Sequence, residues 1–454
     1  MTPSPMTYAA IRFGYGLSPD IPSPASAAEI LGQLQLPDQM AERYPIAHFP
    51  ERAEQERRLG ELRRAKRQDE DGAAAAFKAA NTEALKRSAR DMRMSMLRPV
   101  LSPDGFRERL VRFWADHFAI AAKGKGLRDI TTAYVEDAIR PNITASFRDL
   151  LRAAETHPVM LIYLDQILSV GPNSKAGQKS NRGLNENLAR EILELHTLGV
   201  GGTYSQTDVR EFAELLTGIF YNFRTGFAYR EHTAEPGAET VLGKTYGGKV
   251  GRLEDIYAVL DDLAVHPDTA RHIAGKLAVH FVADQPDPGM VDAMTAAFRD
   301  TGGELVSVYA AMLEHPAAWQ NFGQKAKQPF DFLTSSMRAM GVGADQLENL
   351  PLRKSRIYLA APMRMMGQPW QQPAGPNGWP EETRNWITPQ GLAARIEWAL
   401  MAAGLFESRL DPPEFARVAL GDMAGDELLM LSSRAESRLE GMALVLSSPE
   451  FNRR

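Results

Sequence analysis

The sequence contains no cysteine. Thiol nucleophiles, disulfide bonds, iron–sulfur clusters and cysteine-bound zinc are therefore excluded. It also lacks any apolar run near the roughly 18 residues that a membrane span requires, so no membrane partner is expected. The N-terminus shows no charged and then apolar signal segment. We therefore expect a cytoplasmic protein, or a periplasmic or exported one if a leader has been removed.

Basic charge is not in excess. The 52 Lys and Arg residues are outnumbered by 57 Asp and Glu residues, for a formal net charge of −5. This balance predicts no nucleic-acid partner. Hydrophobic residues make up 44% of the 454 positions, which is ordinary for a globular chain with a sizeable core. We interpret residues 1–454 as one large domain.

Apolar residues recur mostly at spacings of three and four, which predicts an all-α, multi-helix array. Residues 50–97 combine strong helix formers with few apolar positions, which is typical of an exposed helical arm, broken near Asp71-Gly72. Such an arm serves either as a solvated face or as a partner contact. Residues 222–248 instead predict a small β-hairpin insertion around a Pro-Gly turn, with strands at 227–229 and 240–242.

Three His-Pro pairs stand between helical segments: His157-Pro158, His266-Pro267 and His315-Pro316. Proline suits the first turn of a helix because it has no amide hydrogen to leave unpaired. The residue before proline avoids helical geometry. We expect these histidines to be corner residues that hydrogen-bond to backbone.

Residues 185–200 form the most informative segment. At helical spacing Asn187, Glu191 and Glu194 share one face, with Arg190 beside them. The pattern favours an ion-pair ladder from Glu186 through Arg190 to Glu194, and the alternative is a cleft in which Glu191 and Glu194 divide acid and base roles. His196 falls on the opposite, apolar face, as a core histidine or as a base.

A second segment, 109–118, carries Trp114, Asp116 and His117. Asp116 follows Arg112 by four residues, which predicts an ion pair between them. His117 lies among aromatic residues and needs a buried partner. A carboxylate from the 185–200 helix is one candidate, which would bring His117 near Glu191 or Glu194.

Three of the six tryptophans fall in a Pro- and Gly-rich loop at 367–388, at positions Trp370, Trp379 and Trp386. Their rings either stack on a bound ligand or fill the core beneath the loop. The polar loop 171–183 is expected to be mobile or to bind a ligand. A ligand role for His232 stays open, and no metal or cofactor is assigned to any residue.

These segments, in this order, resemble the bacterial domain-of-unknown-function family numbered 1800. The resemblance rests on Phe113 to Phe118, on Asn185 to Val200 with its continuation to Val209, on His266 to Leu277, and on Gly367-Gln-Pro with Gly378-Trp-Pro. The family pattern has Asn at position 116, Trp at 219 and Asp at 233, where this chain has Asp, Ile and Thr. Members of this family are often exported, so the resemblance implies export. Their genes often neighbour those of a second family that resembles sulfatases and alkaline phosphatases, which makes a member of that family a possible partner.

The leading interpretation is a hydrolase of a polysaccharide or related polymer. Its catalytic candidates are Glu191, Glu194, His117 and His196, and its substrate-binding candidates are Trp114, Asp116, Asn187, Arg190, Trp370, Trp379 and Trp386. A non-catalytic binding or assembly protein that works with a partner enzyme is the alternative. A His- and carboxylate-based metalloenzyme is a third, weaker interpretation.

Overall fold

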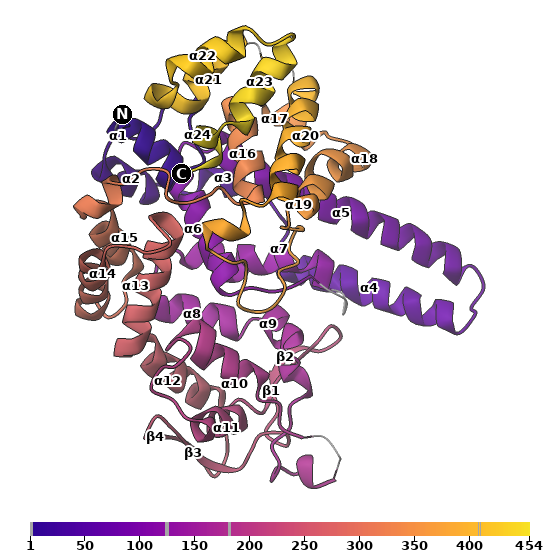
Figure 1. Cartoon of the computed structure of the whole chain (residues 1–454). Coiled ribbons are helices and arrows are strands. Elements are labelled where there is room, and N and C mark those ends of the chain that lie inside the picture. The colour runs from indigo at the N-terminus through magenta and orange to yellow at the C-terminus, as the bar shows by residue number, and fades with distance from the viewer. Residues whose placement is uncertain (1–2, 123–126, 180–182, 407, 409) are drawn as a thin grey trace.

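The computed structural model of the chain describes residues 3–122, 127–179, 183–406, 408 and 410–454. Helices dominate it, and the only strands of the described residues form two small hairpins (Figure 1). The first half contains α1 Pro5–Tyr8, α2 Ala27–Leu34, α3 Gln39–Arg43, α4 Phe49–Arg67, α5 Ala73–Leu101, α6 Gly105–His117, α7 Thr131–Tyr134, α8 Phe147–Glu155, α9 Pro158–Tyr163, α10 Asn187–Glu191 and α11 Gln206–Leu215.

The strands are β1 Ile219–Asn222, β2 Gly226–Tyr229, β3 Gly237–Val241 and β4 Lys244–Gly248. The second half contains α12 Leu253–Ala264, α13 Pro267–Phe281, α14 Pro288–Asp300, α15 Leu305–Glu314, α16 Pro329–Ala339, α17 Ala344–Glu348, α18 Leu352–Ser355, α19 Ala361–Met365, α20 Pro389–Leu405, α21 Pro412–Leu420, α22 Asp426–Ser433, α23 Arg438–Ser447 and α24 Pro449–Asn452. The all-α prediction with a small β insertion is confirmed.

Helices α4 and α5 form a long antiparallel arm that stands away from the body (Figure 1). The break expected near Asp71-Gly72 lies between them, and Gly72 takes a positive φ of 70° that suits its lack of a Cβ. The C-terminal part of α5 packs on α16, α17 and α18, whereas the distal part of the arm is mostly exposed. Only the base of the arm is therefore anchored in the body.

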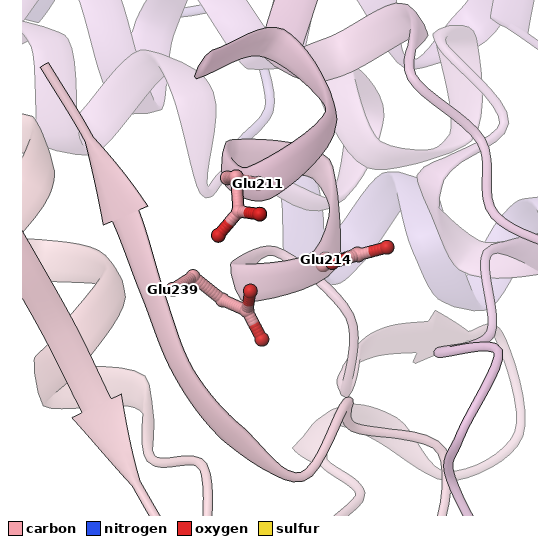
Figure 2. A group of neighbouring side chains, drawn as sticks. All are labelled: Glu211, Glu214 and Glu239. Carbon is pink, nitrogen blue, oxygen red and sulfur yellow. The ribbon is translucent and has the colours of Figure 1, made fainter. Parts of the chain in front are cut away.

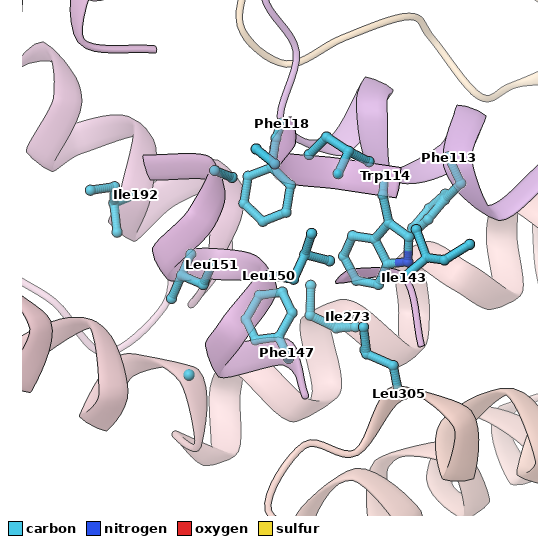
Figure 3. Packing of buried hydrophobic residues seen from close by; sticks show 14 of the residues in the cluster. Phe113, Trp114, Phe118, Ile143, Phe147, Leu150, Leu151, Ile192, Ile273 and Leu305 are labelled. Carbon is cyan, nitrogen blue, oxygen red and sulfur yellow. The ribbon is translucent and has the colours of Figure 1, made fainter. Parts of the chain in front are cut away.

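Two hydrophobic clusters make up the core. The first gathers the faces of α6, α8 and α12 to α15, where Trp114 and Phe118 meet Phe147 and Ile273 (Figure 3). The second is built from α5, α16 and α20 to α24, around the fully buried Trp398. A buried ion pair of 2.9 Å from Arg109 in α6 to Asp331 in α16 joins the two.

The three His-Pro corners are confirmed. Each proline opens a helical segment, and each preceding histidine accepts a backbone N–H through its Nδ1 atom, at distances of 3.1–3.3 Å. The N–H donors belong to Val159, Asp268 and Ala317. These histidines therefore satisfy helix N-termini, as expected for corner residues.

The predicted strand pairing within 222–248 is wrong. Residues 227–229 and 240–242 do not pair with each other; β1 pairs with β2 and β3 pairs with β4. The β3–β4 turn consists of Leu242 and Gly243, both with positive φ, which is the geometry of a tight two-residue hairpin. Pro236 instead precedes β3 and Gly237 begins it, so the Pro-Gly pair is not the turn of either hairpin.

Five-residue π-helical turns interrupt the α-helical pattern at Ala9–Phe13, Val135–Ile139, Ile192–His196 and Arg356–Ala360. Such turns are rare and are frequent at functional sites. The turn at Ile192–His196 directly continues α10, and the Thr197 hydroxyl donates a hydrogen bond of 2.6 Å to the Ile192 carbonyl.

None of the described helices has both the length and the apolar character needed to cross a bilayer.

Candidate functional site

The acidic face of α10 carries the ion-pair ladder that its spacing predicts. Arg190 contacts Glu186 at 3.1 Å and Glu194 at 3.3 Å, and all three side chains are about one-third exposed. Such exposed pairs contribute only about 0.3–0.5 kcal/mol each. Glu194 is thus already paired with a cation, while Asn187 lies at the start of the same helix.

Glu191 differs from Glu194, because no ion pair of Glu191 is found among the described residues. Burial and the nearby Glu194 and Glu155 carboxylates raise the pKa of Glu191 against the opposing effect of His196. Pockets are found at α5–α6, at α2–α3 and along the arm. None of these three pockets is lined by Glu191 or Glu194.

His196 is fully buried on the apolar face, as the helical pattern predicts. Its Nδ1 atom lies 2.7 Å from Oε1 of Glu155 in α8, which is itself only 1% exposed. A buried carboxylate beside a buried imidazole compensates the desolvation that either group alone would suffer. Glu155 belongs to none of the segments that suggested a site, so the sequence alone did not indicate it.

His117 does not contact Glu191 or Glu194, so that prediction is wrong. Its Nε2 atom lies 3.1 Å from the His196 carbonyl oxygen, to which it donates when protonated on that nitrogen. Burial, with the charges of Lys276, His196 and His272, lowers the pKa of His117 well below its usual range. The neutral imidazole is therefore held in the core, between α6 and the end of the π-helical turn.

Asp116 turns toward the loop 367–388 and not toward Arg112. The expected Arg112–Asp116 ion pair does not form; the two Asp116 oxygens accept the Trp379 N–H at 3.0 and 3.1 Å. Burial raises the pKa of Asp116 to about 7, although Arg112 opposes this shift. Gly378 has a φ of +73°, and a Cβ there would lie 2.5 Å from the Asp116 carbonyl oxygen, so the loop approaches α6 as closely as glycine permits.

Lys276 of α13 belongs to the same centre. Burial lowers the pKa of its amine, and the charges of Asp116 and Glu381 partly restore it. Within the described parts of the chain no ion pair of Lys276 is formed at 4 Å or less. Its amine is therefore a cation without a direct partner, close to two carboxylates.

Glu381 enters this centre from the loop, two residues after Trp379. Its Oε1 atom lies 2.6 Å from Nδ1 of His280, and its Oε2 atom lies 3.5 Å from the amine of Lys325. Burial raises the pKa of Glu381, but the charges of His280, Lys325 and Arg454 outweigh burial and hold it well below its usual range. Glu381 thus stays ionised, in contrast to Asp116.

The tryptophans of the loop divide between the two predicted roles. Trp386 is 4% exposed and donates to the Pro380 carbonyl, so it fills the core beneath the loop. Trp379 packs edge-on against Trp386 and is partly exposed, and Trp370 stacks on Phe330 while also remaining partly exposed. Trp114 of α6 is fully buried and donates to Tyr309, so it is a core residue and offers no free surface to a substrate.

A separate group of three carboxylates lies on the surface of α11 and β3. Oxygen atoms of Glu211, Glu214 and Glu239 lie within 4.8 Å of one another (Figure 2). Burial and the neighbouring glutamates raise the pKa of Glu239 to about 8. Carboxylates this close repel each other when both are ionised, and a proton shared by Glu239 and Glu211 would relieve that repulsion.

His232 and the loop 171–183 are distant in sequence from the group of residues around Asp116. His232 is exposed, and its carbonyl accepts the Ala176 N–H at 3.0 Å, so the two segments contact each other. Glu235 accepts the Asn173 backbone and side-chain N–H groups, which secures the first half of the loop. Residues 180–182 lie outside the described residues.

The structure thus brings four of the segments singled out in the sequence to one place. The end of α6 supplies Asp116 and His117, the π-helical turn supplies His196, α13 supplies Lys276 and His280, and the loop supplies Trp379 and Glu381. Sequence reasoning missed His280 and Glu381. A signal existed for both, because His280 follows Lys276 by one helical turn and Glu381 follows the Gly-Trp-Pro element.

Comparisons with known proteins give one match. No curated protein and no solved structure matches the chain significantly. A family model described as "Protein of unknown function (DUF1800)" matches residues 9–453. Because this match spans nearly the whole chain, the protein belongs to the DUF1800 family.

Proposed function

We propose that this chain is a hydrolase of a polysaccharide or related polymer, with Asp116 as its proton donor and Glu381 as its ionised partner. One observation carries the proposal: two carboxyl groups beside Trp379 have their pKa values pushed in opposite directions. Opposite shifts of this kind are typical of a general acid paired with an ionised carboxylate. The earlier candidate pair, Glu191 and Glu194, is less suited because Glu194 and its partner Arg190 are about one-third exposed, so water screens the charge of Glu194.

The chemistry follows from the two protonation states. A carboxyl group with a pKa of about 7 remains partly protonated at neutral pH and can donate its proton to a leaving oxygen. The ionised Glu381 would stabilise positive charge that develops on the substrate as the C–O bond breaks. Water then supplies the hydroxyl group to the cleaved carbon. The partly exposed side chain of Trp379, whose backbone N–H binds Asp116, offers a stacking surface beside that group.

The test is Asp116→Asn, with both activity and stability measured. The amide oxygen of Asn can still accept the Trp379 N–H, so the loop stays anchored. Because the pKa of Asp116 is raised on folding, the folded protein binds the extra proton and loses stability as pH rises from about 4 to above 7. Asn avoids this loss, so the variant should gain roughly 1–2 kcal/mol at pH 8 and nothing at pH 4.

A catalytic Asp116 predicts that the same variant is more stable and yet inactive. Reducing-end release from a panel of neutral and acidic polysaccharides measures the activity, with Glu191→Gln and Glu194→Gln as the rival pair. Full activity of Asp116→Asn, or no hydrolysis of any polymer by the unaltered protein, would overturn the proposal. Because the family pattern has Asn at this position, we expect the activity to be restricted to members with Asp.

A second candidate function rests on the arm formed by α4 and α5. Its distal part stands away from the body and is mostly exposed, so packing against the body does not explain its length (Figure 1). We infer an assembly role, with a partner from the sulfatase- and alkaline-phosphatase-like family as the first protein to try. Co-elution of the purified pair in size-exclusion chromatography, lost when the arm is shortened, is the expected result. Separate elution of the intact pair would reject this partner.

A further inference from the structure

A small pocket lies where α5, α6 and the loop 367–388 meet. Its cavity measures about 60 Å³, enough for a few atoms and too small for a sugar chain. Tyr15 and Phe330 form a buried floor, and Arg112, Trp370 and Gln371 form a partly exposed rim. From α6 the pocket is lined by Glu108, Val111, Arg112 and Ala115, and Arg112 lies one helical turn before Asp116.

The charges that line this pocket leave one cation uncompensated. Glu136 binds Arg98 at 2.6 Å, and Glu108 binds Arg140 closely, so both glutamates are committed to arginines. Arg112 lines the same pocket, and within the described residues it has neither an ion pair nor a hydrogen bond. Its guanidinium lies 4.7 Å from the centre of the Phe330 ring. The pocket therefore offers an anion a cation that no acceptor of the chain occupies.

Two neutral donors in the pocket are also without acceptors. The Tyr15 hydroxyl and the Trp370 Nε1 atom are buried, line the pocket and make no hydrogen bond to the chain. Tyr15 as a whole is only 1% exposed. Buried donors without a partner are uncommon and costly in folded proteins. Burial raises the pKa of Tyr15 far above its usual value, so its hydroxyl keeps its proton and remains a donor.

These three groups converge on one ring. Arg112 lies 4.7 Å, Trp370 6.0 Å and Tyr15 6.2 Å from the centre of the Phe330 ring. Gln371, beside Trp370, takes a φ of +49°, a strained conformation for a residue with a Cβ. Strain of this kind is often stored beside a binding site. The strained backbone of Gln371 therefore accompanies the placement of Trp370 beside the pocket.

We propose that this pocket binds the carboxylate of a small organic acid, with Arg112 as its cation and Tyr15 and Trp370 as its neutral donors. The walls include Val111, Val135 and Phe330, which suit a short apolar tail and do not suit a bare inorganic ion. This site is independent of the hydrolase proposal, because its donors differ from Asp116 and Glu381. It gives Trp370 a role in ligand binding that stacking on Phe330 alone does not explain.

Titration calorimetry with sodium propionate, propionamide and sodium phosphate tests the proposal. Propionate should bind, and the neutral propionamide and inorganic phosphate should bind at least about tenfold more weakly. Arg112→Met should weaken propionate binding by about tenfold or more, whereas Arg128→Met removes an exposed arginine elsewhere and should leave it unchanged. Thermal unfolding of each variant without ligand shows that it is folded.

Tyr15→Phe separates binding from structure. Because the hydroxyl has no partner in the chain, its removal should not lower the melting temperature of the free protein. It should still weaken propionate binding by a few-fold. Equal binding of propionate and propionamide, unchanged binding by Arg112→Met, stronger binding of phosphate, or no binding at all would each overturn the proposal.

Discussion

Asp331 lies between two guanidinium groups in the interior, 2.9 Å from Arg109 and 3.7 Å from Arg454. All three side chains are nearly inaccessible. Burial raises the pKa of Asp331, and the two arginines outweigh burial and lower it. The same competition decides the states of Asp116 and Glu381: Glu381 has Lys325 as a direct cationic partner and His280 as a hydrogen-bond partner, whereas Asp116 has no ion pair within the described residues, and their pKa values move apart.

Glu239 provides a further test of this logic. Its folded-state pKa of about 8 lies above the value of an unfolded chain, so the folded protein takes up a proton and loses stability as pH rises from about 4.5 to 8. Glu239→Gln removes this titration and should raise the free energy of unfolding at pH 8.5 by roughly 1–3 kcal/mol. At pH 4 it should change little. Urea unfolding at the two pH values measures the difference.

A bound cation would reverse this result. If Glu211, Glu214 and Glu239 held a divalent ion, Glu239→Gln would destabilise the protein in the presence of that ion, and a chelator would abolish the difference. Lys244→Gln, which removes an exposed cation from the same hairpin, serves as the control for a general charge effect. Stabilisation by Glu239→Gln that is unaffected by chelator supports the shared proton.

At the scale of elements, the arm and the loop 367–388 differ in how they are held. The end of the arm is mostly exposed and stands away from the body, so replacing residues 63–75 by a short glycine-rich turn should leave the melting temperature within about 2 °C of the parent value. Differential scanning calorimetry measures this. Leu97→Ala, in the anchored part of α5, is the contrasting variant and should cost about 2–5 kcal/mol because Leu97 is fully buried. A large loss on shortening the arm would show that the arm stabilises the body.

The loop depends on its close approach to α6. Gly378→Ala places a Cβ 2.5 Å from the Asp116 carbonyl oxygen and also strains a positive φ. Gly367→Ala strains a positive φ of 94° with no atom within 4 Å, so it isolates the backbone contribution. We expect Gly367→Ala to cost about 1–2 kcal/mol and Gly378→Ala distinctly more, as measured by urea unfolding. Equal costs would mean that the contact with α6 yields easily.

At the scale of the whole molecule, the two hydrophobic clusters share buried links. Arg109 pairs with Asp331 across them and also donates to the Gly14 carbonyl, which lies between Phe13 of the first cluster and Tyr15 of the second. Breaking such a link leaves a buried charge unpaired, which is costly. We therefore expect one cooperative unfolding transition, with calorimetric and van't Hoff enthalpies in agreement. Two separate transitions would show that the clusters are independent domains.

Local sequence patterns were enough to predict the helical class of the fold and the helix starts at the His-Pro corners. Apolar spacing of three and four residues predicted the buried helix face that carries Leu188 and His196. The His-Pro pairs predicted the corners at His157 and His266. Proline geometry and helical periodicity act within a few residues, so the sequence displays them directly. The same holds for the ladder of Glu186, Arg190 and Glu194.

Contacts between residues far apart in the sequence could not be predicted from local spacing. Glu155 lies 41 residues before His196, and Glu381 lies 101 residues after His280, so no local spacing could pair them. The π-helical turn at 192–196 also breaks the regular helical period on which the predicted faces depend. Packing between distant segments decides which carboxylates are paired and which are protonated. It also decides which donors around Phe330 remain free. The reason is that burial and charge act through space and not along the chain.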